Sequence, residues 1–154
     1  MEICGIASIL DNGGEMYFQF LIEDKSTAVL IEQIMIRVHE RYPEKEIYYD
    51  SKSFSGIGGL RKTGKPIEQK TGKLLNDLPL YLKAFNRRLS FMDDAALFIV
   101  LDNDKRDPAQ FYKKLQGIAV DNRITVDYVY CIAVKEMEAW LLGDLSGCGI
   151  SGRL

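Results

Sequence analysis

Three groups of acidic residues follow apolar stretches of this 154-residue chain. After YFQFLI, AALFIVL and DYVYCIAV come, in turn, Glu23-Asp24, Asp102 with Asp104, and Glu136 with Glu138. Alternate residues of an extended segment point the same way, so the two aspartates can present both carboxylates to one ion. Two carboxylates this close raise the pKa of one of them unless a cation joins them. Mg²⁺ prefers carboxylate and phosphate oxygens, so the pattern indicates a Mg²⁺ site for phosphate chemistry, with Mn²⁺ as the alternative ion.

The apolar stretches and the segments between them indicate an α/β domain. Apolar, β-rich runs predict strands over 17–22, 47–49, 95–101 and 127–134. Helices are expected from an N-cap at Ser26 to about 41, over 73–89 with a kink or break at Pro79, from Pro108 to about 116, and over 135–142. This alternation favours a mainly parallel central sheet of about four strands with helices on both faces. Ligands bind at the carboxyl ends of such strands, so we expect the acidic groups to meet there.

Length and composition indicate how the chain is organised. We expect one domain over residues 16–154, with residues 1–15 as an N-terminal extension or an additional hairpin. No apolar run approaches the ~20 residues of a membrane span, and MEICGIASIL lacks the basic flank of a signal peptide. Three cysteines without ligand-like spacing favour free thiols in a reducing compartment. The expectation is a cytoplasmic protein that does not associate with membranes.

The formal net charge of −2 is unevenly distributed. From residue 61 to residue 88, eight basic residues against Glu68 and Asp77 give a charge of +6, which leaves −8 for the remainder. Such a basic segment is typical of nucleic-acid contact, because Lys and Arg neutralise phosphates, although a solvated loop and helix surface has the same composition. The residues expected to contact nucleic acid are Arg61, Lys62, Lys65, Lys70, Lys73, Arg87 and Arg88.

The acidic motifs also carry a resemblance to a known family. A glutamate after the first strand, followed by Asp-x-Asp after a later one, resembles the Toprim domain of topoisomerases, primases and OLD-type nucleases. The segments VLDNDKRDP and YCIAVKEMEAWLLGD are similar to uncharacterised Toprim-like proteins that are often encoded near ATPases of restriction and defence systems. The resemblance covers about residues 16–144.

The resemblance implies a role for each acidic residue. Glu23 would be the general acid or base, Asp102 and Asp104 would bind the metal, and Glu138 would be a further acidic ligand. Asp144 is a weaker candidate. The chain departs from the family at Asp24, where Toprim domains usually have glycine, and at its end, ten residues after Asp144, where family members continue. The second departure leaves a C-terminal truncation open.

Three functions remain as interpretations of these features. The first is magnesium-dependent phosphodiester chemistry on nucleic acid, as a nuclease or related phosphotransfer enzyme, in a defence system with an ATPase partner. The alternative is a non-catalytic partner or binding domain with a vestigial acidic site. The third is a receiver-like phosphoacceptor domain, for which Glu23-Asp24 and Lys135 are loosely suitable but no isolated aspartate is. The sequence does not distinguish DNA from RNA, or cleavage from strand transfer.

Overall fold

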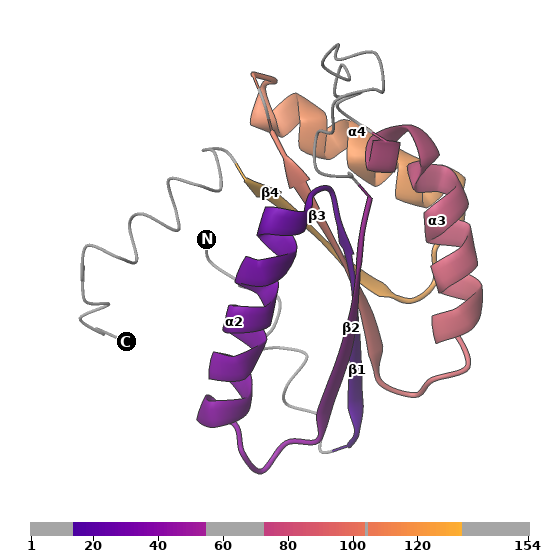
Figure 1. The fold of residues 1–154 in the computed structure, drawn as a ribbon. Coiled ribbons are helices and arrows are strands. Elements are labelled where there is room, and N and C mark those ends of the chain that lie inside the picture. The colour runs from indigo at the N-terminus through magenta and orange to yellow at the C-terminus, as the bar shows by residue number, and fades with distance from the viewer. Residues whose placement is uncertain (1–13, 55–72, 104, 134–154) are drawn as a thin grey trace, which may run out of the picture.

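The computed structural model describes residues 14–54, 73–103 and 105–133, which form one sheet and the helices that cover it (Figure 1). The strands are β1 (Met16–Ile22), β2 (Ile47–Ser53), β3 (Ala95–Asp102) and β4 (Asp127–Ala133). All are parallel, in the order β2-β1-β3-β4. The helices between them are α2 (Lys25–Arg41), α3 (Lys73–Leu89) and α4 (Pro108–Asp121). The predicted α/β fold with a parallel sheet of about four strands is confirmed.

The two faces of the sheet bury separate clusters, because successive strand side chains point to opposite sides. Phe18 and Phe98 belong to the cluster under α2, with Met35 of that helix. Leu21 belongs to the cluster under α3 and α4, with Leu78 of α3. Figure 1 shows α2 on one side of the strands and α3 and α4 on the other. The prediction that helices cover both faces is therefore confirmed.

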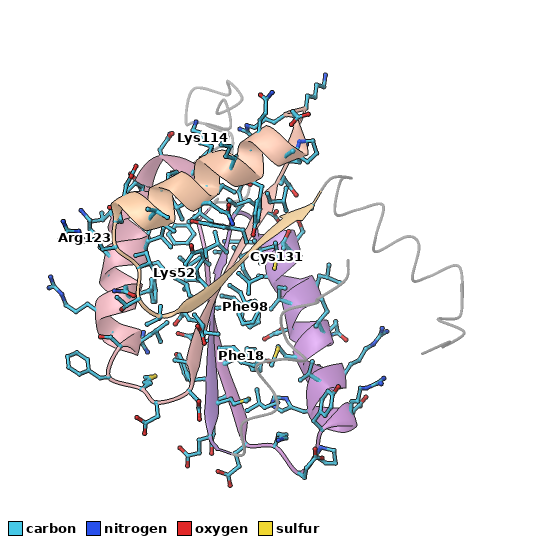
Figure 2. All side chains as sticks on the ribbon, turned by 180° about the vertical axis from the view of Figure 1, so that it is seen from behind. Phe18, Lys52, Phe98, Lys114, Arg123 and Cys131 are labelled. Carbon is cyan, nitrogen blue, oxygen red and sulfur yellow. The ribbon has the colours of Figure 1, made fainter. Side chains whose placement is uncertain are left out.

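Aromatic packing holds the centre of the sheet together. The rings of Phe18 and Phe98 meet edge to face with centroids 5.2 Å apart, and Phe98 also stacks on Phe20 at 4.9 Å. Figure 2 shows Phe18 and Phe98 deep between the strands and α2. Both side chains are almost fully buried, and such pairs contribute more than their buried area alone. This core fixes β1 and β3 side by side.

Helix α2 begins earlier than the sequence predicted. The N-cap is Asp24, not Ser26, because the Asp24 carboxylate accepts a hydrogen bond from Thr27 N at 2.7 Å. The Ser26 hydroxyl instead donates to Asp24 Oδ1 at 2.6 Å. The prediction of Ser26 as the cap is therefore wrong, since an aspartate one position before the helix reaches the first-turn amides equally well.

Helices α3 and α4 each continue through a residue that disfavours helix, Pro79 in α3 and Gly117 in α4. Helix α3 has the predicted bounds and continues through Pro79. Helix α4 extends past the predicted end near 116 to Asp121. It passes Gly117 because Phe111, Leu115 and Ala119 bury one stripe at helical spacing, and that packing outweighs the weak propensity of glycine.

Two predicted elements lie largely or wholly outside the described residues: the 1–15 extension and the 135–142 helix. Among the helices that are described, none combines the length and apolar character that crossing a bilayer would require.

Candidate active site at the carboxyl ends of β1 and β3

The strand order creates a binding position between β1 and β3. The chain passes from β1 through α2 to β2 on one side, then returns through α3 to β3 on the other side. The connection after β1 leads to β2 at one edge of the sheet, and the connection after β3 leads to β4 at the other edge. Ligands of open α/β sheets bind beyond the carboxyl ends of two strands whose connections diverge in this way. Ile22 of β1 is paired with Val100 of β3, so Glu23 and Asp102 reach this same position.

Glu23 and Asp102 are in direct contact there. Glu23 Oε2 accepts a hydrogen bond from the backbone N of Asp102 at 2.9 Å, and the backbone N of Glu23 donates to Val100 O at 3.1 Å. Both side chains are half-buried. The backbone of the two strand ends therefore fixes both the position of Glu23 and the orientation of its carboxylate. The structure brings together two of the four acidic residues that the sequence singled out.

Asn103 adds an oxygen atom that the sequence analysis did not single out. Its side chain is 3% exposed, its backbone N donates to Ala133 O at 2.9 Å, and its Nδ2 donates to Arg106 O at 2.6 Å. Its Oδ1 is buried and accepts no hydrogen bond in the structure. An unsatisfied buried acceptor costs about 1–3 kcal/mol, so this atom lowers the stability of the strand end unless it finds a donor.

Arg106 approaches the backbone at the end of β3. Its Nη1 is 3.5 Å from Asp102 O and 3.4 Å from Asn103 O, and its guanidinium carbon is 4.7 Å from the centroid of the Phe111 ring. Phe111 is buried on α4, whereas Arg106 is exposed. The backbone of Asp102 thus links the Glu23 carboxylate on its N–H side to a guanidinium on its C=O side.

Asp24 does not contribute to this site as an additional ligand. It accepts hydrogen bonds from Ser26 Oγ at 2.6 Å and from Thr27 Oγ1 at 2.8 Å, in addition to the Thr27 amide. Burial works against its charge, but the hydrogen bonds from Ser26 and Thr27 outweigh burial and hold the pKa of Asp24 below its usual value. Both carboxylate oxygens cap α2, and the receiver-like interpretation, which needs an acidic pair after the first strand, loses support.

The remaining predicted acidic residues lie outside the described part of the chain: Asp104, Glu138 and Asp144. Within the described ranges, no three His, Cys, Asp or Glu side chains are grouped so that they could hold a metal ion. Among the described residues, Glu23 and Asp102 are thus the two that bring carboxylates to these adjacent strand ends.

Of the predicted nucleic-acid residues, only Arg87 and Arg88 have described side chains, and they lie away from Glu23. Arg61, Lys62, Lys65 and Lys70 lie outside the described residues, and the side chain of Lys73, at the start of α3, is not described. Arg87 and Arg88 lie in the last turn of α3, where Arg88 Nη2 donates to the Tyr17 hydroxyl at 3.4 Å. Tyr17 precedes Glu23 by six residues of strand, or about 20 Å. Arg88 is therefore at the opposite end of β1 from Glu23.

That opposite end also contains a hollow of about 270 Å³, lined by Gly14, Glu15, Glu44, Lys45 and Glu46. The lining is acidic and largely solvent-exposed, and it includes no buried, unpartnered polar group among the described residues. We place the candidate site at the strand ends that carry Glu23 and Asp102, because this hollow offers no comparable pairing of side chains.

The sequence analysis did not single out Asn103 and Arg106. In the sequence, Asn103 occupies the variable position of Asp-x-Asp, and Arg106 is one of several basic residues. Neither position by itself indicates burial or a ring contact. Comparisons with protein-family models, with curated proteins and with solved structures found no match to this chain.

Proposed function

We propose that this chain carries out magnesium-dependent chemistry on phosphodiesters of nucleic acid at the carboxyl ends of β1 and β3. The observation that carries the proposal is the 2.9 Å hydrogen bond from Asp102 N to Glu23 Oε2. It joins two carboxylate-bearing residues 79 positions apart in the sequence, at the position where open α/β sheets bind ligands.

The side chains at this position are suited to a hard divalent cation. Carboxylate oxygens are among its preferred ligands, and Glu23 and Asp102 carry two carboxylates at adjacent strand ends. Asp102 and Asp104 would hold the ion, with Glu138 as a further ligand. When bound, magnesium would neutralise charge on a phosphoryl group and orient its oxygens. Mn²⁺ takes similar ligands and is the natural substitute.

Glu23 is proposed as the residue that gives or takes a proton. Its carboxylate is held by the Asp102 amide, so one oxygen has a fixed direction at the end of β1. A general acid or base must be positioned before its proton affinity matters, and this hydrogen bond provides the positioning.

Nucleic acid as the substrate class rests on the Toprim-like motifs and on the basic 61–88 segment, not on a contact in the described residues. A defence-system context and an ATPase partner come from the same resemblance and are proposals with it. A cytoplasmic location is proposed from the three cysteines without ligand-like spacing.

Thermal unfolding with and without MgCl₂ or MnCl₂, followed by cleavage assays on labelled single- and double-stranded oligonucleotides, tests the proposal. A metal that binds only the folded chain stabilises it by about 1.4 kcal/mol at ten times its Kd. Asp102→Asn together with Asp104→Asn should abolish that gain and any cleavage. Without metal, the same double variant should be at least as stable as the wild type, because like-charge repulsion is relieved.

Glu44→Gln together with Glu46→Gln is the matched control, since it also removes two carboxylates but at the other end of the sheet. It should leave the metal-induced shift unchanged. A shift that survives in the Asp102 and Asp104 double variant would place the metal elsewhere. Binding of oligonucleotides without cleavage in any divalent metal would instead favour the non-catalytic binding domain.

A further inference from the structure

We propose that β2 pairs antiparallel with the β2 strand of a second copy of this chain, so that the two sheets join into one. The interface is centred on Ser51 and spans residues 49–53. The proposal follows from three features of this strand: its place at the edge of the sheet, the backbone groups that point away from β1, and the order of its charges.

The first feature is that β2 is an edge strand with exposed side chains. The sheet has the order β2-β1-β3-β4, so β2 is hydrogen-bonded to β1 alone among the described strands. Figure 1 shows β2 with α2 on one side and α3 on the other. The side chains of Tyr48, Asp50, Ser51 and Lys52 are exposed. An exposed edge of this kind is a template for pairing with another strand.

The second feature is that alternate residues of β2 direct their backbone groups away from β1. Phe54 N donates to Ile22 O at 3.1 Å, so the even-numbered residues of the parallel pair bond to β1 and the odd-numbered ones point outwards. At the amino end, the outward-pointing Ile47 O accepts a hydrogen bond from His39 Nε2 at 2.8 Å. That end of the edge is therefore closed, and the outward groups of residues 49–53 are the ones suited to a second strand.

The third feature is the order of the charges, which selects one register. An antiparallel pair centred on Ser51 places Asp50 of each copy opposite Lys52 of the other, and opposite charges at such positions stabilise neighbouring strands. A register moved by two residues instead places Asp50 opposite Asp50, or Lys52 opposite Lys52. A register moved by one residue opposes outward-pointing backbone groups to inward-pointing ones. Charge and backbone therefore agree on a single, self-complementary arrangement, as a two-fold dimer requires.

Both charged side chains can take these new partners without disturbing the fold. The Asp50 carboxylate accepts a hydrogen bond from Ser51 N at 2.8 Å. The Lys52 ammonium lies 5.1 Å from the ring centroid of Tyr81 and 5.6 Å from that of Phe54, and no carboxylate among the described residues pairs with it. In the dimer, Ser51 N donates to Ser51 O of the second copy, and the released Asp50 carboxylate pairs with Lys52 of that copy.

An interface of five residues per strand is small. It falls below the ~1,200 Å² of standard-size complexes, so we expect a weak dimer that forms as the protein concentration rises. Because the two β2 strands run antiparallel, the candidate sites at Glu23 lie at opposite ends of the joined sheet. Dimerisation and the proposed metal site are therefore independent, and either one can fail without the other.

Sedimentation velocity of the full chain in reducing buffer, over a wide range of concentration, tests the proposal. The wild type should shift from monomer to dimer. Asp50→Lys alone or Lys52→Asp alone should weaken self-association at least about tenfold, because each replaces two attractive pairs by two repulsive ones. An equimolar mixture of these two variants should restore the dimer, since each copy then meets the opposite charges. The double variant, Asp50→Lys with Lys52→Asp, should also dimerise.

Two further variants separate this edge from the rest of the surface. Asp127→Lys is the matched control, because it makes the same charge change at the exposed first residue of β4, the other edge strand. It should alter self-association by less than about threefold, as expected for a screened charge. Ser51→Pro removes an N–H that points away from β1, so it should abolish the dimer while circular dichroism shows the fold unchanged.

Three results would overturn the proposal. The first is a wild type that stays monomeric at every concentration. The second is a dimer that Ser51→Pro and both single charge variants leave unchanged, because its interface would then lie elsewhere. The third is failure of the mixed Asp50→Lys and Lys52→Asp chains to associate although each is folded, which would exclude this register even if Ser51→Pro did not fold.

Discussion

Two polar clusters lie along β1, and each contains an arginine over an aromatic ring. The Tyr17 cluster consists of Tyr17, Gln19, Asp50 and Arg88, with the Arg88 guanidinium carbon 6.0 Å from the Tyr17 ring centroid. The Glu23 cluster consists of Glu23, Asp102, Asn103 and Arg106, with the corresponding distance to Phe111 at 4.7 Å. Both clusters also contain a buried side-chain amide, Gln19 in the first and Asn103 in the second. They differ in whether the oxygen of that amide accepts a hydrogen bond.

The Tyr17 cluster satisfies its own hydrogen bonds. Gln19 is fully buried, its Nε2 donates to Asp50 O at 3.2 Å, and its Oε1 accepts from the Tyr17 hydroxyl at 3.4 Å. Burial raises the pKa of Tyr17, an effect that Arg88 opposes and Asp50 reinforces, so the hydroxyl remains a donor near neutral pH. Stability of the fold alone explains this arrangement.

The Glu23 cluster differs at one atom, the side-chain oxygen of Asn103. It buries the Oδ1 of Asn103 without a partner, and it places two carboxylate residues side by side at a strand end. Natural proteins leave few buried acceptors unpaired, and those that remain often mark a site with a further role. The comparison teaches that polar content alone does not distinguish the two ends of this sheet, whereas the pairing of the buried Asn103 side chain does.

The largest expected effect comes from the core that both clusters share. Phe98→Ala should lower the free energy of unfolding by about 3–5 kcal/mol, because it removes a buried ring that contacts Phe18 and Phe20. Urea denaturation measures the loss. Phe91→Ala is the control: its side chain is 87% exposed, and the change should cost no more than about 0.5 kcal/mol. Similar losses in the two variants would mean that the core is not where the structure places it.

A smaller effect should separate the two clusters directly. Gln19→Ala should destabilise the chain by about 1–3 kcal/mol in metal-free buffer, since it removes a buried residue with hydrogen bonds at both ends. Asn103→Ala also loses a hydrogen bond but removes an unsatisfied acceptor, so its net cost should stay within about 1 kcal/mol. Urea denaturation of both variants gives the comparison. Equal costs would show that Oδ1 has a partner in the metal-free protein, and the contrast between the clusters would disappear.

The smallest effect concerns the helix cap next to Glu23. Asp24→Ala should cost about 1 kcal/mol near neutral pH through loss of the α2 cap. Because the folded state lowers the pKa of Asp24, this stabilisation is present above the unfolded pKa of about 4 and is lost as pH falls through the folded value. The stability gap between wild type and Asp24→Ala, measured by thermal unfolding across pH, should therefore close in acid.

Asp24→Asn is the matched control, since asparagine caps helices about as well without titrating. It should match the wild type near neutral pH and exceed it in acid. Loss of the magnesium-induced stabilisation in Asp24→Asn would show that Asp24 takes part in the metal site rather than only in the cap.

The sequence by itself was sufficient for the element order and the class of fold. Continuous apolar runs such as 95–101 and helical spacing such as that of α3 are local patterns, and local patterns predicted all four described strands and all three described helices. Their ends were less accurate. Whether Asp24 or Ser26 caps α2, and whether α4 continues past Gly117, depends on hydrogen bonds and packing that only the folded chain makes.

Only the tertiary structure decided how the chemistry-bearing residues are grouped. The predicted meeting of Glu23 and Asp102 depended on the strand order, which local patterns do not contain and which places β1 beside β3. The same long-range arrangement places Arg88 beside Tyr17, and about 20 Å of strand separates Tyr17 from Glu23. Burial of Asn103 and the stacking of Arg106 on Phe111 depend on how α4 packs, so the sequence offered no sign of either.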